Sequence, residues 1–291
     1  MSSPALDPRT AIGPVWLTIS NLRDSIKFYD ESLGFRLRYE EAGTAFLGVG
    51  SADLLILTEI PGAVRVLGMT GLYHFAILLP TRRDLARSLQ HLFATGTRLQ
   101  GAADHLVSEA LYLADPDGNG IELYRDRPKQ DWIHDSSGLR MTTDPLDLNS
   151  LLLECKEPRW PWLGFPPQTT IGHIHLQVAD LTAAEGFYHD VLGFDLVTRY
   201  GRSASFLSAG GYHHHIAINT WAGAGAPPPP PGSIGLREFV VKVPNVVDLG
   251  KLVARVSRSG IPVEESPTGV LVRDPSQNLL RLTSEETANL S

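Results

Sequence analysis

One short pattern occurs twice in the chain, and this repeat constrains the fold more than any other feature of the sequence. Residues 24–35, DSIKFYDESLGF, return as residues 183–194, AAEGFYHDVLGF. Each copy follows a strand-like segment, Val15 to Ile19 in the first and His173 to Val178 in the second. The pattern predicts a helix that buries its Phe-Tyr pair, packs a Leu one turn later and ends at a Gly before the next strand.

Two weaker copies of the same unit open at Leu72 to Leu79 and at Leu236 to Val243. Helices are expected to follow them near Arg82 to Ala94 and near Val246 to Ser259. Each of the four units reads as a strand, a helix and about three further strands. We therefore predict an α+β chain built from four βαβββ modules with mixed, curved sheets.

The four modules are expected to form two tandem domains, residues 11–126 and 170–285, with a linker at 127–169. Proline, tryptophan and charged residues are frequent in this linker, which predicts a tether that wraps the surface: Pro158, Trp160, Pro161, Trp162, Pro166 and Pro167. The run Pro227 to Pro231 is predicted to be an extended polyproline spacer between the third and fourth modules. A ligand for a proline-recognition domain is the less favoured interpretation.

Composition limits the class of protein and its partners. A chain of 291 residues is long enough for two domains, and its single cysteine, Cys155, excludes an internal disulfide and suits a reducing compartment. The first ten residues lack the regions of a signal peptide, and no run approaches the roughly 20 apolar residues of a membrane span. A net charge of -7 without a basic cluster argues against nucleic acid as a partner. We expect a cytoplasmic protein that binds neither nucleic acid nor membrane.

The stretch 103–124, ADHLVSEALYLADPDGNGIELY, places a carboxylate among apolar residues. It reads as two strands joined by the turn residues 115–120. Since side chains alternate along a strand, Glu122 and Tyr124 share one face. A Glu in such surroundings is costly unless it is paired or bound to a cation.

The same stretch resembles the signature of type I extradiol ring-cleavage dioxygenases. The matching residues are His105, Leu111, Tyr112, Asp115, Pro116, Gly118 and Glu122; Ala103 departs from the residues usual at its position. Paired βαβββ modules with a Phe-Tyr-x-x-x-Leu-Gly-Phe helix resemble the vicinal oxygen chelate superfamily, which includes glyoxalases, antibiotic-resistance proteins and extradiol dioxygenases. The resemblance implies two tandem domains of that fold and a metal-bearing cleft, and it specifies the fold better than the reaction.

The resemblance also implies a ligand set of two imidazoles and one carboxylate on one face of an iron(II) ion, with open positions for substrate and dioxygen. His74 lies on the first strand of module two, Glu122 on the last strand of the same module, and His173 on the first strand of module three. These three residues occupy equivalent places in the repeat. We predict that they are the metal ligands.

In familiar extradiol enzymes the third and fourth modules carry the site, but the fourth module here departs from that pattern. It has Glu238 where the pattern requires His, and Arg281 where it requires Glu; Arg cannot ligate a metal. We therefore expect modules two and three to form the metal-bearing cleft. The alternative ligand set is His173, Glu238 and one of His213 to His215, which would leave the signature stretch unexplained.

Three consecutive His residues precede the apolar residues Ile216-Ala217-Ile218. On a strand, alternation would turn His214 away from His213 and His215. In the resembled family a His placed ahead of an aliphatic-Ala pair is the acid-base catalyst, and this match assigns the role to His214. His213 and His215 are then supporting groups, or weaker candidates if the register slips by one residue.

Tyr112 and His105 resemble the family's hydrogen-bonding residues on the substrate side, with a core aromatic as the alternative interpretation of Tyr112. The implied reaction is extradiol cleavage of catechol or a substituted catechol in aromatic hydrocarbon catabolism, which inserts both atoms of dioxygen and yields a 2-hydroxymuconic semialdehyde-type product. Iron(II) is the expected metal and manganese(II) the alternative. A homo-oligomer is kept as an alternative to a monomer.

Two other functions are compatible with the same fold. A glyoxalase-like isomerase or metal-dependent transferase predicts a fourth protein ligand and indifference to oxygen. A non-enzymatic small-molecule-binding protein predicts no need for His74, Glu122 or His173.

Overall fold

The computed structural model describes residues 5–136, 138–155 and 161–288. Pro158 and Trp160 of the predicted linker lie outside the described residues. The chain divides into two compact units. The N-terminal unit comprises Leu17–Arg65 and His74–Ile171, and the C-terminal unit comprises Met1–Trp16, Val66–Tyr73 and Gly172–Ser291. The domain boundaries expected from the sequence stay a prediction.

The first two predicted modules are confirmed as βαβββ units. Module one contains β1 (Ala11–Ile19), α1 (Leu22–Lys27), η1 (Phe28–Leu33), β2 (Arg36–Glu41), β3 (Thr44–Val49) and β4 (Ala52–Glu59). Module two contains β5 (Gly71–Leu78), α2 (Arg82–Ala94), β6 (Gly101–Asp104), β7 (Ser108–Ala114) and β8 (Gly120–Asp126).

The last two modules repeat this order. Module three contains β12 (Thr170–Gln177), α4 (Leu181–Glu185), η4 (Gly186–Val191), β13 (Asp195–Tyr200), β14 (Ala204–Ser208) and β15 (Ile216–Asn219). Module four contains β16 (Gly235–Val243), α5 (Val246–Arg258), β17 (Glu264–Ser266), β18 (Gly269–Arg273) and β19 (Leu279–Ser284), followed by α6 (Glu285–Ala288). The Pro227 to Pro231 run lies in the loop between β15 and β16, where the sequence places a spacer.

The described part of the segment between modules two and three contains only short elements. They are η2 (Lys129–Asp131), β9 (His134–Asp135), β10 (Gly138–Leu139), β11 (Asp144–Pro145), α3 (Leu148–Leu152) and η3 (Leu153–Cys155). Several contacts attach its described part to module two. Strand β11 pairs with β6, and Arg82 of α2 donates to the Ser150 carbonyl and to the Glu154 carboxylate.

The repeated Phe-Tyr helix forms as predicted, except that Phe28 of the first copy is only half-buried, and it has one addition. Asn21 caps its first copy by accepting from the Asp24 backbone, Tyr29 and Leu33 are buried, and Gly34 ends it with φ 108°, a value that favours glycine. The addition is a π-helical last turn, in which the Gly34 N–H donates to the Tyr29 carbonyl five residues earlier. The wider turn was not predicted from the sequence.

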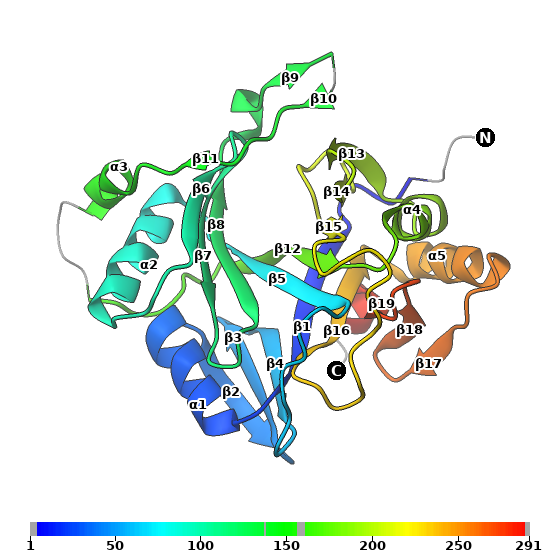
Figure 1. Cartoon of the computed structure of the whole chain (residues 1–291), viewed down its shortest axis with the longest axis horizontal. Coiled ribbons are helices and arrows are strands. Elements are labelled where there is room, and N and C mark those ends of the chain that lie inside the picture. The colour runs from blue at the N-terminus through cyan, green and yellow to red at the C-terminus, as the bar shows by residue number, and fades with distance from the viewer. Residues whose placement is uncertain (1–4, 137, 156–160, 289–291) are drawn as a thin grey trace. The chain divides into compact units, whose positions relative to one another are not determined.

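Within the N-terminal unit, β2, β3 and β4 form an antiparallel meander, and β6, β7 and β8 form another that continues to β5. Strands β5 and β8 run parallel with Ala76 opposite Glu122, while Tyr112 of β7 lies opposite Glu122 from the other side. Figure 1 shows α2 alongside these strands.

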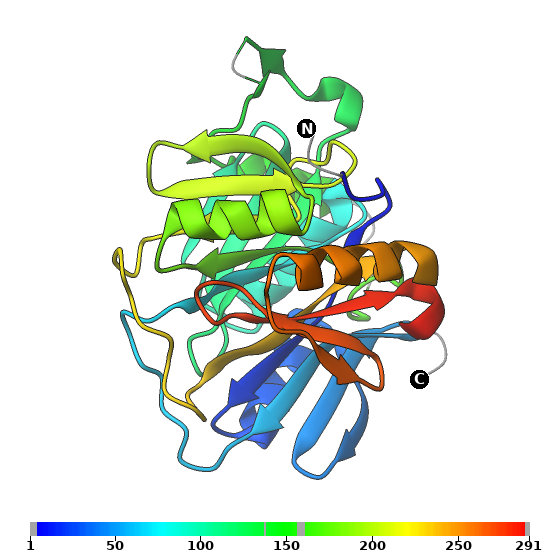
Figure 2. The same ribbon diagram turned by 90° about the vertical axis from the view of Figure 1, so that its right-hand side faces the viewer.

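The C-terminal unit repeats this arrangement. Strand β12 runs parallel to β15 beside the β13–β14 hairpin, and β16 runs parallel to β19 beside β17 and β18. Figure 2 shows α4 and α5 lying across the strands of their own modules. The longest helices, α2 and α5, have 13 residues each, and no helix of the described ranges combines the length and apolarity needed to cross a bilayer.

A buried Tyr-Asp hydrogen bond joins the two modules of each unit. Tyr29 donates to Asp115 at 2.9 Å in one unit, and Tyr188 donates to Asp274 at 2.9 Å in the other. Burial raises the pKa of both carboxyls and raises the pKa of both phenols well above its usual value, so each Tyr stays a donor. The turn part of the signature stretch is therefore a structural device that both halves share.

Candidate functional site

The site is centred on His74 and Glu122, which lie on neighbouring parallel strands. His74 precedes Ala76 by two residues on β5, and Ala76 is the register partner of Glu122 on β8. Both side chains are buried, and His74 Nε2 lies 3.0 Å from Glu122 Oε2. The neighbouring residues Phe75 and Leu123 are fully buried and belong to the apolar core, as strand alternation predicts.

His173 joins this pair as a third potential ligand. The ligand atoms of His74, Glu122 and His173 all lie within 4.8 Å of one another, and no other such group is found among the described residues. All three side chains are less than a tenth exposed, which is costly for a carboxylate and two imidazoles unless they bind one another or a cation. Two imidazoles and one carboxylate suit a first-row divalent metal and leave coordination positions open. The residues present therefore fit such an ion.

Tyr112 lies beside His74 and is hydrogen-bonded to His105. The Tyr112 ring lies 5.7 Å from the His74 ring, and its hydroxyl lies 2.7 Å from His105 Nε2. His105 Nδ1 lies 2.5 Å from the Thr142 carbonyl, which can only accept, so Nδ1 carries a proton. In the neutral ring Nε2 is then an acceptor, and the Tyr112 hydroxyl donates to it. This leaves the hydroxyl oxygen able to accept a hydrogen bond from a ligand.

His105 does not lie on a strand, in contrast to the two-strand interpretation of the signature stretch. It occupies the turn between β6 and β7, next to Leu106, whose φ of 66° lies in the left-handed region. The Asp104 side chain accepts from the Leu106 N–H and stabilises this turn. The turn directs the His105 ring toward both Tyr112 and Thr142.

The three consecutive His residues are all buried, but strand alternation does not apply to them because β15 begins only at Ile216. The rings of His213 and His214 are in contact, with their Nδ1 atoms 2.8 Å apart. The prediction that His214 faces away from His213 is therefore wrong. The ring centroid of His214 lies 4.0 Å from that of His173, and the His213 centroid lies 6.0 Å from it.

His215 has different surroundings. Its Nδ1 accepts from the Ala209 N–H, and its ring packs near Tyr212 and Phe194. Burial, together with the neighbouring His213 and His173, lowers the pKa of His215 to about 3. This imidazole is consequently neutral at neutral pH.

Glu238, the carboxylate of the alternative ligand set, is bound by an arginine instead. Its two oxygens accept from Arg281 at 2.6 and 3.0 Å. Arg281 also donates to Ser266 and Thr268. The alternative set of His173, Glu238 and one of His213 to His215 is not gathered among the described residues.

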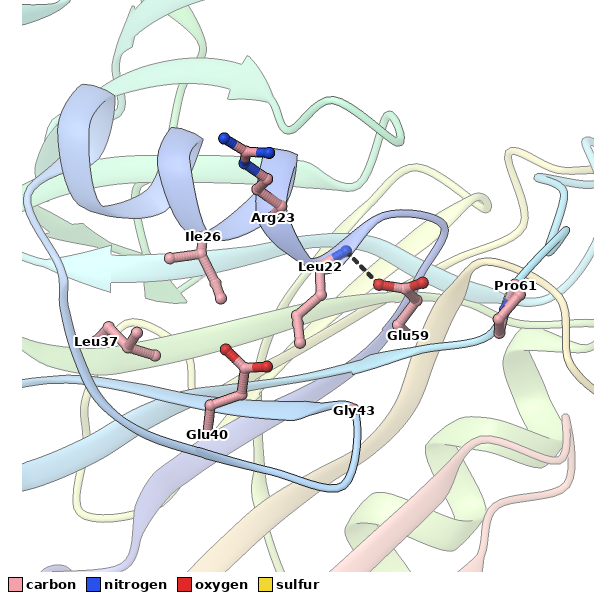
Figure 3. A pocket seen from close by; sticks show the side chains of 8 residues that line it. All are labelled: Leu22, Arg23, Ile26, Leu37, Glu40, Gly43, Glu59 and Pro61. Atoms are coloured by element: carbon pink, nitrogen blue, oxygen red, sulfur yellow. Dashed lines mark hydrogen bonds between the residues drawn. The ribbon is translucent and has the colours of Figure 1, made fainter.

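A surface pocket of the N-terminal unit is separate from these residues (Figure 3). It lies beside α1 and is lined by Leu22, Arg23, Ile26, Leu37, Glu40, Gly43, Glu59 and Pro61. The Glu59 carboxylate accepts from the Leu22 N–H at 2.8 Å and so caps the helix. The polar groups predicted to do chemistry do not line this pocket.

Comparison with protein families gives matches over both halves of the chain. Residues 11–123 and 170–282 match the model of the Glyoxalase/Bleomycin resistance protein/Dioxygenase superfamily. Catechol-2,3-dioxygenase of Bacillus subtilis (strain 168) is 47% identical over 271 residues, 91% of this chain and 94% of that protein. Biphenyl-2,3-diol 1,2-dioxygenase 3 of Rhodococcus globerulus is 29% identical over 123 residues, 40% of this chain and 64% of that protein.

Solved structures give the same architecture. A putative dioxygenase from Bacillus subtilis subsp. subtilis str. 168 matches with a TM-score of 0.64 at 13% identity, over 97% of this chain and 86% of that chain. Glyoxalase I from Zea mays matches with a TM-score of 0.60 at 16% identity, over 97% of this chain and 94% of that chain. At these identities the likeness concerns the fold alone.

Proposed function

Because the chain belongs to the glyoxalase/bleomycin resistance protein/dioxygenase superfamily, we propose that it is an extradiol dioxygenase that cleaves catechol or a substituted catechol. The reaction consumes one dioxygen, inserts both of its atoms and yields a 2-hydroxymuconic semialdehyde-type product. The grouping of His74, Glu122 and His173 is the observation that carries the proposal. The relatives named catechol-2,3-dioxygenase and biphenyl-2,3-diol 1,2-dioxygenase support it.

We assign the metal ligands to His74, Glu122 and His173, with iron(II) as the metal and manganese(II) as the alternative. When bound, a divalent ion lowers the pKa of a coordinated catechol hydroxyl and provides a position for dioxygen. One carboxylate and two neutral imidazoles leave the divalent site with one net positive charge. A catechol that has lost a single proton therefore gives a neutral site.

Tyr112 and His105 hold the substrate. The Tyr112 hydroxyl donates a hydrogen bond to His105, so its oxygen accepts from the substrate hydroxyl that keeps its proton. His105 is fixed by the Thr142 carbonyl and so holds Tyr112 in one orientation. The pair thereby orients the substrate ring before the reaction.

His214 moves the protons. Its ring lies beside that of His173, and an imidazole takes and returns a proton near neutral pH. His213 shares a hydrogen bond with His214 through their Nδ1 atoms, so one ring donates and the other accepts. We assign His213 to orienting His214 and His215 to a structural role. The single cysteine suits a reducing compartment, and we place the protein in the cytoplasm. A role in aromatic hydrocarbon catabolism follows from the proposed reaction alone.

The test is anaerobic loading with iron(II), followed by catechol in air while the yellow product and oxygen consumption are recorded. We expect Glu122→Ala to abolish both metal retention and turnover. His214→Phe should keep the metal and lose about 100- to 10,000-fold in rate, the usual range for general acid-base catalysis. His134→Phe, at an exposed linker residue, is the matched control and should behave as wild type.

Two results would exclude the proposal. Turnover of a substrate without oxygen consumption would favour the glyoxalase-like alternative. A binding protein would be favoured if iron-loaded wild type bound catechol without turning it over, and if this binding survived the loss of all three ligands. Normal turnover by His214→Phe would remove only its assignment as the proton carrier.

A further inference from the structure

Glu109 is a buried carboxylate that the proposed reaction does not use. It lies on β7, three residues before Tyr112, so strand alternation turns the two side chains to opposite faces of the sheet. Arg82 of α2 donates to both oxygens of Glu109 at 2.9 and 3.2 Å, and Arg125 of β8 donates to one of them at 2.8 Å. These two arginines already neutralise the carboxylate, and a third one, Arg127, also reaches it.

Arg127 acts on a row of three carboxylates. The strand register places Asp144 of β11 opposite Asp104 of β6, and Asp104 opposite Glu109 of β7. Like charges directly opposite each other on neighbouring strands are destabilising. Arg127 offsets this repulsion, because its Nη2 donates to Asp104 Oδ2 at 2.5 Å and to Glu109 Oε1 at 3.3 Å. Arg127 thus holds Asp104 in place between two groups of its own charge.

The Asp104 side chain in turn supports the turn that carries His105. Its Oδ1 accepts from the Leu106 N–H at 2.9 Å, and Leu106 has a φ of 66°, which is unfavourable for a residue with a Cβ. The backbone of Arg127 contacts the same turn, because its N–H donates to the Val107 carbonyl at 2.8 Å. Arg127 therefore holds this turn both through Asp104 and through its own backbone.

The turn determines where the His105 ring lies. The ring is held at two points, by the Tyr112 hydroxyl 2.7 Å from Nε2 and by the Thr142 carbonyl 2.5 Å from Nδ1. A return of Leu106 to negative φ would change the course of the chain after His105 and move the ring away from Tyr112. Since a misplacement of about 1 Å can cost about 100-fold in rate, the conformation of this turn matters to the proposed reaction.

We propose that Arg127 and Asp104 are positioning residues: Arg127 holds Asp104, Asp104 holds the turn, and the turn keeps His105 against Tyr112. This inference rests on the proposed function and adds two residues to the same site. All of these residues belong to the N-terminal unit. Asp104 and Glu109 are register partners and share the face of the sheet opposite to Tyr112, so their effect on the substrate passes through His105.

Kinetics of the iron-loaded enzyme with catechol test the positioning role. Arg127→Met should lower kcat/KM about 10-fold, because Asp104 is then repelled by its neighbours and leaves the Leu106 N–H. In a Tyr112→Phe background the same substitution should cost less than about 2-fold, because His105 then has no hydroxyl to hold. A loss of stability alone would lower kcat/KM equally in both backgrounds.

Arg82→Met is the matched control. Arg82 binds the same Glu109 carboxylate as Arg127, but it also donates to Ser150 and Glu154 of the linker instead of supporting the turn. We expect the folded variant to unfold at a lower urea concentration than wild type. Its kcat/KM should stay within about 2-fold of the wild-type value.

Asp104→Asn should rescue Arg127→Met. Asn keeps an oxygen for the Leu106 N–H and removes the charge that Asp144 and Glu109 repel. The double variant should recover kcat/KM to within about 3-fold of wild type. Asp104→Ala removes the same charge but also the oxygen, and it should give no rescue. Equal rescue by Asn and Ala would contradict the role of Asp104.

A spectroscopic measurement separates failure of this inference from failure of the proposed function. The His105 Nδ1–H, held by the Thr142 carbonyl, should give a slowly exchanging ring signal in magnetic resonance spectra of protein with isotope-labelled histidine. Its absence in His105→Gln assigns the signal. Arg127→Met should lose the signal, and Arg82→Met should keep it.

An unchanged signal in folded Arg127→Met would overturn the inference, as would an equal loss of kcat/KM with and without the Tyr112 hydroxyl. If wild type failed to turn over catechol while the His105 signal behaved as expected, only the proposed reaction would be overturned.

Discussion

The same place in the repeat holds a potential metal site in one module and an ion pair in another. His74 and Glu122 lie on the parallel strands β5 and β8, and Glu238 and Arg281 lie on the parallel strands β16 and β19. The two registers agree. The residue two positions after His74 is the register partner of Glu122, and the residue two positions after Glu238 is the register partner of Arg281. The two backbones are thus alike and the side chains decide the chemistry.

The difference lies in what each pair can offer to a cation. Arg281 is permanently charged, donates two hydrogen bonds to Glu238 and has no lone pair for a metal. The neutral imidazole of His74 has a lone pair, and Glu122 brings a negative charge beside it at 3.0 Å. Module four therefore uses this position for stability, and module two keeps it suited to a metal.

Placing a Glu-Arg pair at the positions of His74 and Glu122 is the most severe test of this difference between the two modules. The double substitution His74→Glu with Glu122→Arg should give a folded protein, because Glu238 and Arg281 occupy the same geometry in module four. Metal binding and catechol cleavage should both be lost completely, since Arg supplies no ligand. Circular dichroism checks the fold, and metal analysis and product absorbance check the loss. Retained turnover would contradict our assignment.

Breaking the ion pair should affect stability and spare the metal. Arg281→Met leaves Glu238 buried without its partner, and we expect a loss of about 3–5 kcal/mol in the free energy of unfolding. Adding Glu238→Gln removes the uncompensated charge and should recover part of this loss. Urea denaturation of the single and double variants measures both values. A metal content below that of wild type in folded Arg281→Met would show that the two places are not independent.

The shared Tyr-Asp hydrogen bond should behave alike in both halves. Tyr29→Phe and Tyr188→Phe each remove one donor from a buried carboxylate, which costs about 1.5–3 kcal/mol in the free energy of unfolding. Urea denaturation of the two variants should give similar values. A large loss in one half and none in the other would refute the view that this part of the signature is structural.

The dependence of stability on pH gives a further test, because His215 is a buried imidazole that belongs to neither the His74–Glu122 pair nor the Glu238–Arg281 pair. In the unfolded chain this imidazole binds a proton below about pH 6.5, but in the folded chain only below about pH 3. Its contribution to folding is unaffected above pH 6.5, and acidification between the two values then lowers stability by about 1.4 kcal/mol per pH unit.

His215→Asn keeps an acceptor for the Ala209 N–H and should remove this dependence. Unfolding free energies at pH 7 and pH 5 measure the effect, with His134→Asn as the exposed control. An equal pH dependence in wild type and His215→Asn would contradict the buried, neutral state of His215.

Much of the fold could be predicted because each copy of the repeat contains the residues that begin and end its helix. The Phe-Tyr helix has a capping residue before it and Gly34 or Gly193 after it, and both glycines adopt positive φ values. The π-helical last turn could not be predicted, because it depends on which carbonyl the Gly34 N–H reaches in three dimensions. The same reasoning from equivalent places in the repeat led to His74, Glu122 and His173.

Residues in turns were harder to interpret. The contact between His213 and His214 was missed because alternation holds only within a strand. The Thr142 carbonyl, which fixes His105, belongs to the segment predicted as a tether, and a backbone acceptor leaves no mark on the sequence.

Metal content per chain tests the central claim most directly. Iron(II) is loaded anaerobically into wild type, Glu122→Gln, His173→Ala and Arg281→Gln, excess metal is removed, and the bound metal is quantified by elemental analysis. We predict one ion per chain in wild type and in Arg281→Gln, and almost none in Glu122→Gln or His173→Ala. A full ion per chain in folded Glu122→Gln, or its loss in folded Arg281→Gln, would contradict the account.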